Sequence, residues 1–290
     1  MSTLAEKWHA FTLITRMDRP IGTYLLLWPT LWALWIAEGG FPGWHLLIVF
    51  SLGVFIMRSA GCIINDIADR KIDGYVQRTK QRPLIKGSLT TQSAIVIFIA
   101  LLLIALLLVL TLSWYTIGLS LVAVILATIY PFMKRYTHFP QVVLGAAFSW
   151  GMIMAFAEIR QSIPTVAWLL FAANLVWTVA YDTMYAMVDR DDDLRIGVKS
   201  TAIIFGRFDT LIISLLQLIT LLLLFKVGQI EQFNVFYYLG LIILAGMFMY
   251  QQKLIKNRER ANCFKAFLHN HYGLLCVLIA IIFQYEPVWI

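Results

Sequence analysis

Nine apolar runs, each about as long as a bilayer is thick, dominate this sequence. About 20 apolar residues in an α-helix cross the hydrocarbon core of a bilayer, which is roughly 30 Å thick. Backbone groups inside lipid must satisfy one another, so such runs fold as packed helices. We therefore predict an all-α polytopic membrane protein, a single domain over residues 1–290. Its nine transmembrane helices are predicted at 21–37, 44–64, 93–112, 114–132, 141–157, 165–188, 210–227, 236–251 and 266–283.

The loops between these runs differ sharply in charge. On one side they contain nearly all of the 23 lysines and arginines, whereas the other side has only Arg160 and Lys226. Basic loops stay in the cytoplasm, which predicts a cytoplasmic N-terminus and an external C-terminus. The net charge of +7 therefore reflects membrane topology and not a nucleic-acid surface. Residues 1–20 place Trp8, Phe11 and Ile14 on one helical face, which predicts an amphipathic segment on the membrane surface.

An acidic run follows directly on the second apolar stretch. If the helix continues, Asp66, Asp69 and Asp73 occupy positions i, i+3 and i+7 and share one face. Carboxylates stacked in this way repel one another unless a cation lies among them. An oxygen-only ligand set suits Mg²⁺ better than Zn²⁺. Cysteines and histidines show no metal-ligand spacing anywhere in the chain.

A second acidic run ends the sixth apolar stretch. Asp182, Asp189 and Asp193 fall at i, i+7 and i+11, again on one helical face. One acidic helix end is usually only a solvated turn, but two on the same predicted side favour a shared site. Long loops at a site often bind ligands, so residues 65–92 and 189–208 are predicted to be cytoplasmic active-site loops.

Basic and aromatic residues accompany the two acidic runs. Carboxylates and cations gathered at the cytoplasmic end of the bundle would suit a metal-bound diphosphate. The apolar interior of the bundle would suit a lipid tail. A prenyl diphosphate has both parts. Arg58, inside an apolar run, suits the carboxylate of an aromatic acid, although it could instead snorkel to the interface. Three tyrosines near the cytoplasmic ends of their spans, Tyr130, Tyr181 and Tyr185, could stabilise an allylic cation or simply anchor the helices at the interface. The predicted substrate-binding residues are Arg58, Asn65, Arg78, Arg82, Tyr130, Lys134, Arg135, Tyr181 and Lys199.

The run NDIADRKIDGYVQRTKQRP resembles the NDxxDxxxD signature of the UbiA superfamily of intramembrane prenyltransferases. The later YDTMYAMVDRDDD resembles the second acidic motif of that family. Three further stretches, DRPIGTYLLLWPTLWALW, YPFMKRYTHFPQVVLGAAF and YQQKLIKNRERANCFKAF, resemble the branch that prenylates 4-hydroxybenzoate in ubiquinone biosynthesis. The resemblance covers nearly the whole chain.

This resemblance implies nine helices around a central cavity in a bacterial inner membrane. It implies Mg²⁺-dependent transfer of a polyprenyl chain from polyprenyl diphosphate to the carbon of 4-hydroxybenzoate that is meta to the carboxylate. Asp69, Asp73, Asp189 and Asp193 would be catalytic, and Arg58 would take the aromatic carboxylate. The implied metal ligands are Asn65, Asp66, Asp69, Asp73, Asp182, Asp189 and Asp193. No role is implied for Asp191 or Asp192.

Two alternatives stay open at the level of sequence. The acceptor could be a naphthoate, a haem or another quinone precursor, although Arg58 favours a benzoate. A cation-coupled transporter would also use acidic sites, but transporters place them near the bilayer midplane. Besides the substrates and the lipid bilayer, no feature of the sequence predicts an obligate protein partner.

Overall fold

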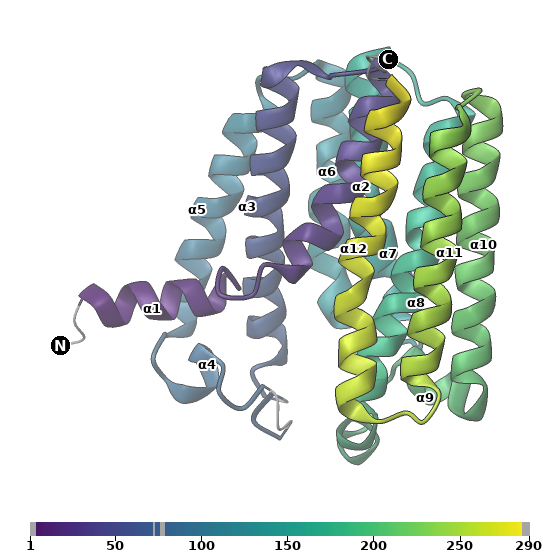
Figure 1. Cartoon of the computed structure of the whole chain (residues 1–290). Helices are drawn as coiled ribbons and strands as arrows, with labels where there is room; N and C mark the ends of the chain where they lie inside the picture. The colour runs from purple at the N-terminus through teal and green to yellow at the C-terminus, as the bar shows by residue number, and fades with distance from the viewer. Residues whose placement is uncertain (1–3, 72, 76–78, 286–290) are drawn as a thin grey trace.

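A computed structural model describes residues 4–71, 73–75 and 79–285, and these residues form helices and no strands. The all-α membrane fold is therefore confirmed (Figure 1). The helices, in chain order, are α1 (Leu4–Ile14), α2 (Ile21–Glu38), α3 (Gly43–Asp69), η1 (Asp73–Tyr75), α4 (Pro83–Lys86), α5 (Thr91–Val109), α6 (Trp114–Met133), α7 (Pro140–Arg160), α8 (Thr165–Ile196), α9 (Thr201–Phe205), η2 (Gly206–Phe208), α10 (Asp209–Ile230), α11 (Val235–Ile255) and α12 (Arg260–Tyr285).

The predicted count of nine spans is corrected to eight among the described residues. Eight helical segments are long and apolar enough to cross a membrane: α3, α5, α6, α7, α8, Thr201–Ile230, α11 and α12. The first predicted run does form a helix, α2, but this 18-residue helix, which contains Pro29 and ends at Glu38, is not among the eight. It still packs within the bundle, against α7, α12 and α3.

The long helices run side by side, and the short elements gather at one end of the bundle (Figure 1). Helices α4 and α9 lie at that end, whereas the C-terminus of the described chain lies at the other. Helix α1 lies almost perpendicular to the bundle and contacts α3 and α4. Its Ile14 is buried and its Trp8 is 62% exposed, so one face of the helix packs against the protein and Trp8 lies outside that contact.

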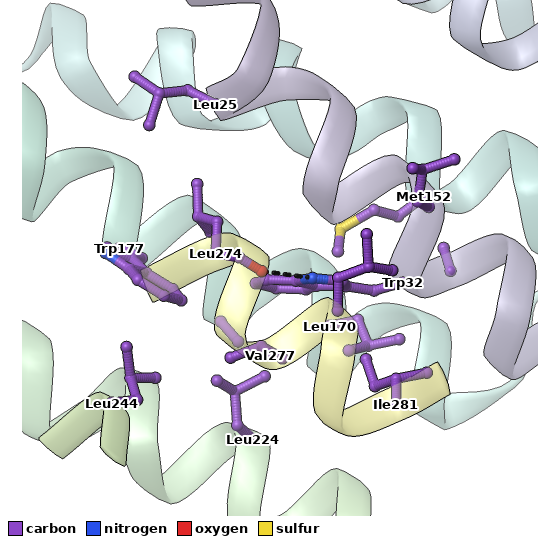
Figure 2. Packing of buried hydrophobic residues seen from close by; sticks show 14 of the residues in the cluster. Leu25, Trp32, Met152, Leu170, Trp177, Leu224, Leu244, Leu274, Val277 and Ile281 are labelled. Carbon is purple, nitrogen blue, oxygen red and sulfur yellow. Dashed lines mark hydrogen bonds between the residues drawn. The ribbon is translucent and has the colours of Figure 1, made fainter. Parts of the chain in front are cut away.

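Large side chains fill the centre of the bundle between α2, α7, α8 and α12. Trp32 and Trp177 are fully buried, and their ring centroids lie 6.0 Å apart. The Trp32 indole donates a hydrogen bond to the Leu274 carbonyl at 3.0 Å, which fixes α2 against α12 (Figure 2). The Trp177 indole donates to Asn270 Oδ1 at 2.8 Å, so both buried indoles are satisfied as a dry interior requires.

The two helices that carry the acidic runs end differently. Helix α8 continues to Ile196, and Gly197 ends it in a left-handed conformation with φ of 73°. Asp182, Asp189 and Asp193 therefore do share one helix. Helix α3 ends at Asp69, and Asp73 lies in the separate turn η1, so the prediction of one continuous helix through Asp73 is wrong.

Candidate active site

A cavity of about 310 Å³ lies where α3, α6 and α8 end and α2 and α7 begin. Six carboxylates line it, three from each acidic run. They are Asp66, Asp69, Asp73, Asp182, Asp189 and Asp193. Residues more than a hundred positions apart thus meet in one space, at the end of the bundle where α4 and α9 lie.

The first three carboxylates are buried and paired with cations. Arg82 Nη1 lies 3.0 Å from Asp66 Oδ1 and 2.5 Å from Asp73 Oδ2, so one guanidinium joins α3 to η1. Lys134, at the end of α6, donates to Asp69 Oδ2. These pairs compensate carboxylates that burial alone would make costly.

Asp191 and Asp192 belong to the second run but are held elsewhere. The Arg260 guanidinium, at the start of α12, lies 3.1 Å from Asp191 and 3.6 Å from Asp192. Neither aspartate lines the cavity. Their contacts place them on the outer side of α8, facing α12.

Most of the predicted substrate-binding residues meet in this cavity. Its lining includes Arg58, Asn65, Arg82, Tyr130, Lys134, Tyr181 and Lys199. Arg135 is different: its guanidinium donates to the Ala68 carbonyl at 2.5 Å, outside the lining. Arg78 lies outside the described residues.

Sequence reasoning missed two cations of the cavity, Arg16 and Arg19. Arg16, between α1 and α2, lines the cavity and pairs with Asp66 at 2.8 Å. It lies in the segment predicted to rest on the membrane surface. No local sequence pattern relates a basic residue there to a carboxylate 50 positions later. Only the turn after α1 brings Arg16 to α3.

The carboxylates of the cavity offer oxygen ligands, but by themselves they do not form a complete metal-binding site. Among the described residues, no group of three or more His, Cys, Asp or Glu side chains is close enough to hold a metal ion. Mg²⁺ commonly binds through one or two carboxylates, with phosphate oxygens and waters as its other ligands. Asp69 Oδ1 is buried without a hydrogen-bond partner, which leaves one oxygen of the required chemistry in place. The donor set therefore fits Mg²⁺ bound together with a phosphate ligand.

A second, apolar cavity of about 360 Å³ adjoins the first. Side chains of α2, α3, α5, α6 and α7 line it, among them Phe50, Leu102 and Val124. Five residues line both cavities: Arg58, Gly61, Tyr130, Leu144 and Phe148. A ligand with a charged head and an apolar tail could therefore place one part in each cavity.

Arg58 stands at this junction without an acidic partner. No ion pair joins it to a carboxylate of the described chain, and its Nε is buried without a hydrogen-bond partner. Cys62, Tyr130, Tyr181 and Tyr185 line the same cavity as Arg58. A guanidinium in such surroundings favours an anionic ligand.

A cluster of ion pairs around the buried Asp209 holds the other side of α8. Asp209 is fully buried and pairs with Arg190, which lies beside Asp189 on α8, and with Arg258 at 2.7 Å. Hydrogen bonds to Asp209 raise the pKa of the Arg258 guanidinium in the α11–α12 loop. Arg190 also donates to the Ala202 carbonyl at 2.6 Å, so the cluster links α8 to the chain around α9.

The sequence profile of the UbiA prenyltransferase family matches residues 26–275 of this chain. The 4-hydroxybenzoate octaprenyltransferase of Colwellia psychrerythraea is 64% identical over 98% of this chain and 99% of its own length. The enzyme of the same name from Tolumonas auensis is 58% identical over 95% of this chain and 96% of its own length.

Solved structures share the fold at lower identity. The apo structure of a UbiA homolog from Aeropyrum pernix K1 has a TM-score of 0.80 and 21% identity, over 91% of this chain and 98% of that one. A UbiA homolog from Archaeoglobus fulgidus bound to GPP and Mg²⁺ has a TM-score of 0.72 and 16% identity, over 94% of this chain and 99% of that one.

Proposed function

This chain belongs to the UbiA prenyltransferase family, and we propose that it transfers a polyprenyl chain from polyprenyl diphosphate to 4-hydroxybenzoate, in ubiquinone biosynthesis. The new C–C bond forms at the ring carbon meta to the carboxylate. The allylic C–O bond breaks, its electron pair leaves with the diphosphate, and the ring loses a proton. The names of relatives 58% and 64% identical support this acceptor.

The observation that carries the proposal is the junction of the two cavities. The acidic cavity suits a metal-bound diphosphate, and the apolar cavity suits the hydrocarbon chain. The allylic carbon would then lie near the shared residues, beside Arg58 and Tyr130. The two halves of a prenyl diphosphate would thus occupy adjoining cavities that share five lining residues.

The carboxylates of both runs would hold the metal, with Asp69 and Asp189 facing it from α3 and α8. When bound, Mg²⁺ supplies positive charge that stabilises the departing diphosphate. Arg82, Lys134 and Lys199 line the same cavity and would bind phosphate oxygens directly. The UbiA homolog from Archaeoglobus fulgidus bound to GPP and Mg²⁺ supports a role for this metal.

Aromatic side chains surround the place where positive charge would develop on the allylic carbon. Tyr130, Tyr181 and Tyr185 line the cavity, and Tyr181 is almost completely buried. Aromatic faces attract a cation without hydrating it or reacting with it as a basic nitrogen would. Arg58 would bind the acceptor carboxylate in two-point fashion and so orient the ring.

We also infer that the protein is a multi-pass protein of a bacterial inner membrane, with its N-terminus and the acidic cavity on the cytoplasmic side. The charge asymmetry of the loops supports this orientation. The exposed apolar side chains of α5 and α6, such as Leu107 and Leu121, support contact with lipid.

To test the proposed activity, ring-labelled 4-hydroxybenzoate, a polyprenyl diphosphate and Mg²⁺ are added to membranes that contain this protein. After extraction with organic solvent, the label is expected in the organic phase. Adding a chelator, which removes the metal, should abolish this transfer of label. Parallel reactions contain a labelled dihydroxynaphthoate. Transfer to the naphthoate alone would contradict the acceptor, and transfer to neither aromatic acid would contradict the proposed activity.

A further inference from the structure

Gly22, in the first turn of α2, lies directly against the guanidinium of Arg58 on α3. The glycine is buried and lines the acidic cavity. A Cβ atom at this position would lie 2.6 Å from Arg58 Cζ, and closer still to Nε and Nη2. Since no real Cβ approaches other atoms so closely, any larger residue would displace the guanidinium.

The backbone does not require glycine here. Gly22 lies within a helix and is not among the glycines with positive φ. Glycine weakens a helix relative to alanine, so local structure alone would favour alanine at this position. The close approach of Arg58 is what accounts for the missing side chain.

The place of the Arg58 guanidinium matters because Arg58 lines both cavities. Its Nε is buried without a partner, so no hydrogen bond from that atom fixes the guanidinium. The backbone of α2 at Gly22 therefore forms the surface against which the guanidinium rests. A shift of the α2 surface by one methyl group would move the guanidinium relative to the tyrosines around it.

We propose that Gly22 is a positioning residue for the aromatic acceptor: by leaving space against α2, it sets the place of the Arg58 guanidinium that takes the carboxylate. This inference rests on the proposed function, since it deepens the role of Arg58 in that reaction. It assigns a specific role to the glycine of the DRPIGTY stretch, which lies far in sequence from both acidic runs.

The test is a comparison of Gly22→Ala with the wild-type enzyme under steady-state conditions. A displaced guanidinium loses charge-assisted hydrogen bonds to the carboxylate, so KM for 4-hydroxybenzoate should rise by about tenfold or more. KM for the polyprenyl diphosphate should stay within about twofold. The matched control is Gly246→Ala in α11, where an added Cβ meets nothing within 4 Å and both KM values should stay unchanged.

A double-mutant cycle separates this role from a general structural effect. In an Arg58→Ala background, Gly22→Ala should add less than about a twofold change in acceptor KM, because the clashing group is gone. An equal effect in both backgrounds, an unchanged acceptor KM in the single variant, or a change confined to donor KM would overturn the proposal. A Gly22→Ala protein that fails to fold would also contradict it, because the helix should tolerate alanine.

The same design distinguishes this inference from the proposed function. If the wild-type chain prenylates another aromatic acid in place of 4-hydroxybenzoate, the proposed acceptor is wrong. The cycle is then run with that acid, and the coupling between Gly22 and Arg58 is tested on its own.

Discussion

Arg16 Nη2 lies 2.8 Å from Oδ1 and 2.9 Å from Oδ2 of Asp66, so residues 50 positions apart form a two-point ion pair. Asp66 is 1% exposed, and Arg16 adopts a left-handed backbone conformation with φ of 59°. The turn after α1 therefore holds a strained residue against the first acidic run.

Removing the Arg16 side chain should destabilise the protein. Arg16→Ala leaves the buried Asp66 with Arg82 as its remaining cation, and a loss of about 2 kcal/mol in unfolding free energy is expected. Arg16→Gly should be less destabilising, because glycine adopts positive φ without strain. Thermal unfolding of the detergent-solubilised variants measures both, and equal losses would contradict the role of backbone strain.

One aspartate from each acidic run should be essential for turnover. Asp69→Ala and Asp189→Ala each remove a carboxylate from the cavity, and turnover should fall by at least about a hundredfold. The control is Asp191→Ala, since Asp191 is exposed and pairs with Arg260 outside the cavity. Its activity should stay near that of the wild type. Normal turnover in Asp69→Ala, with correct membrane insertion of all three variants, would refute the metal assignment.

Arg58 should act on the acceptor and not on the donor. Arg58→Ala should raise KM for 4-hydroxybenzoate by about tenfold or more, because a charge-assisted pair is lost. Arg58→Lys should recover part of the loss, since it keeps the charge without the two-point geometry. Steady-state kinetics with each substrate varied in turn provides the measurement, and a rise in donor KM alone would assign Arg58 to the diphosphate.

The apolar cavity should limit the length of the donor chain. Ala123 lies on α6 in the lining of this cavity, and Ala123→Trp would fill part of its 360 Å³. Turnover with long polyprenyl diphosphates should fall, whereas a short donor such as geranyl diphosphate should still react. Competition between the two donors measures the ratio, and an unchanged ratio would show that the chain lies elsewhere.

The apolar runs predicted the membrane fold, and the helical spacing of the two acidic runs, together with their place on one predicted side of the membrane, predicted that they share a site. Asp182, Asp189 and Asp193 share α8 as their spacing requires. Asp73 reaches the same cavity by a different route, since α3 ends at Asp69 and Arg82 holds the following turn. Asp73 therefore lines the cavity although it does not share a helix with Asp66 and Asp69, and its role as a metal ligand stays a prediction.

Contacts between distant segments could not be predicted from spacing. Arg16 and Arg135 are both basic residues near helix ends, yet Arg16 enters the cavity and Arg135 binds the Ala68 carbonyl outside it. Asp191 and Asp192 pair with Arg260, a residue of the last helix. Each outcome depends on the direction of a turn and on the packing of α12, which a single sequence does not encode in any local pattern.

Under the proposed function, both acidic runs hold one Mg²⁺-bound diphosphate whose hydrocarbon chain enters the apolar cavity. The most direct measurement is an experimental structure of this chain with Mg²⁺ and an unreactive prenyl thiodiphosphate. The diphosphate is expected between Asp69 and Asp189, with the hydrocarbon chain passing Tyr130 toward Val124. A diphosphate bound outside this cavity, or held by one acidic run alone, would contradict this expectation.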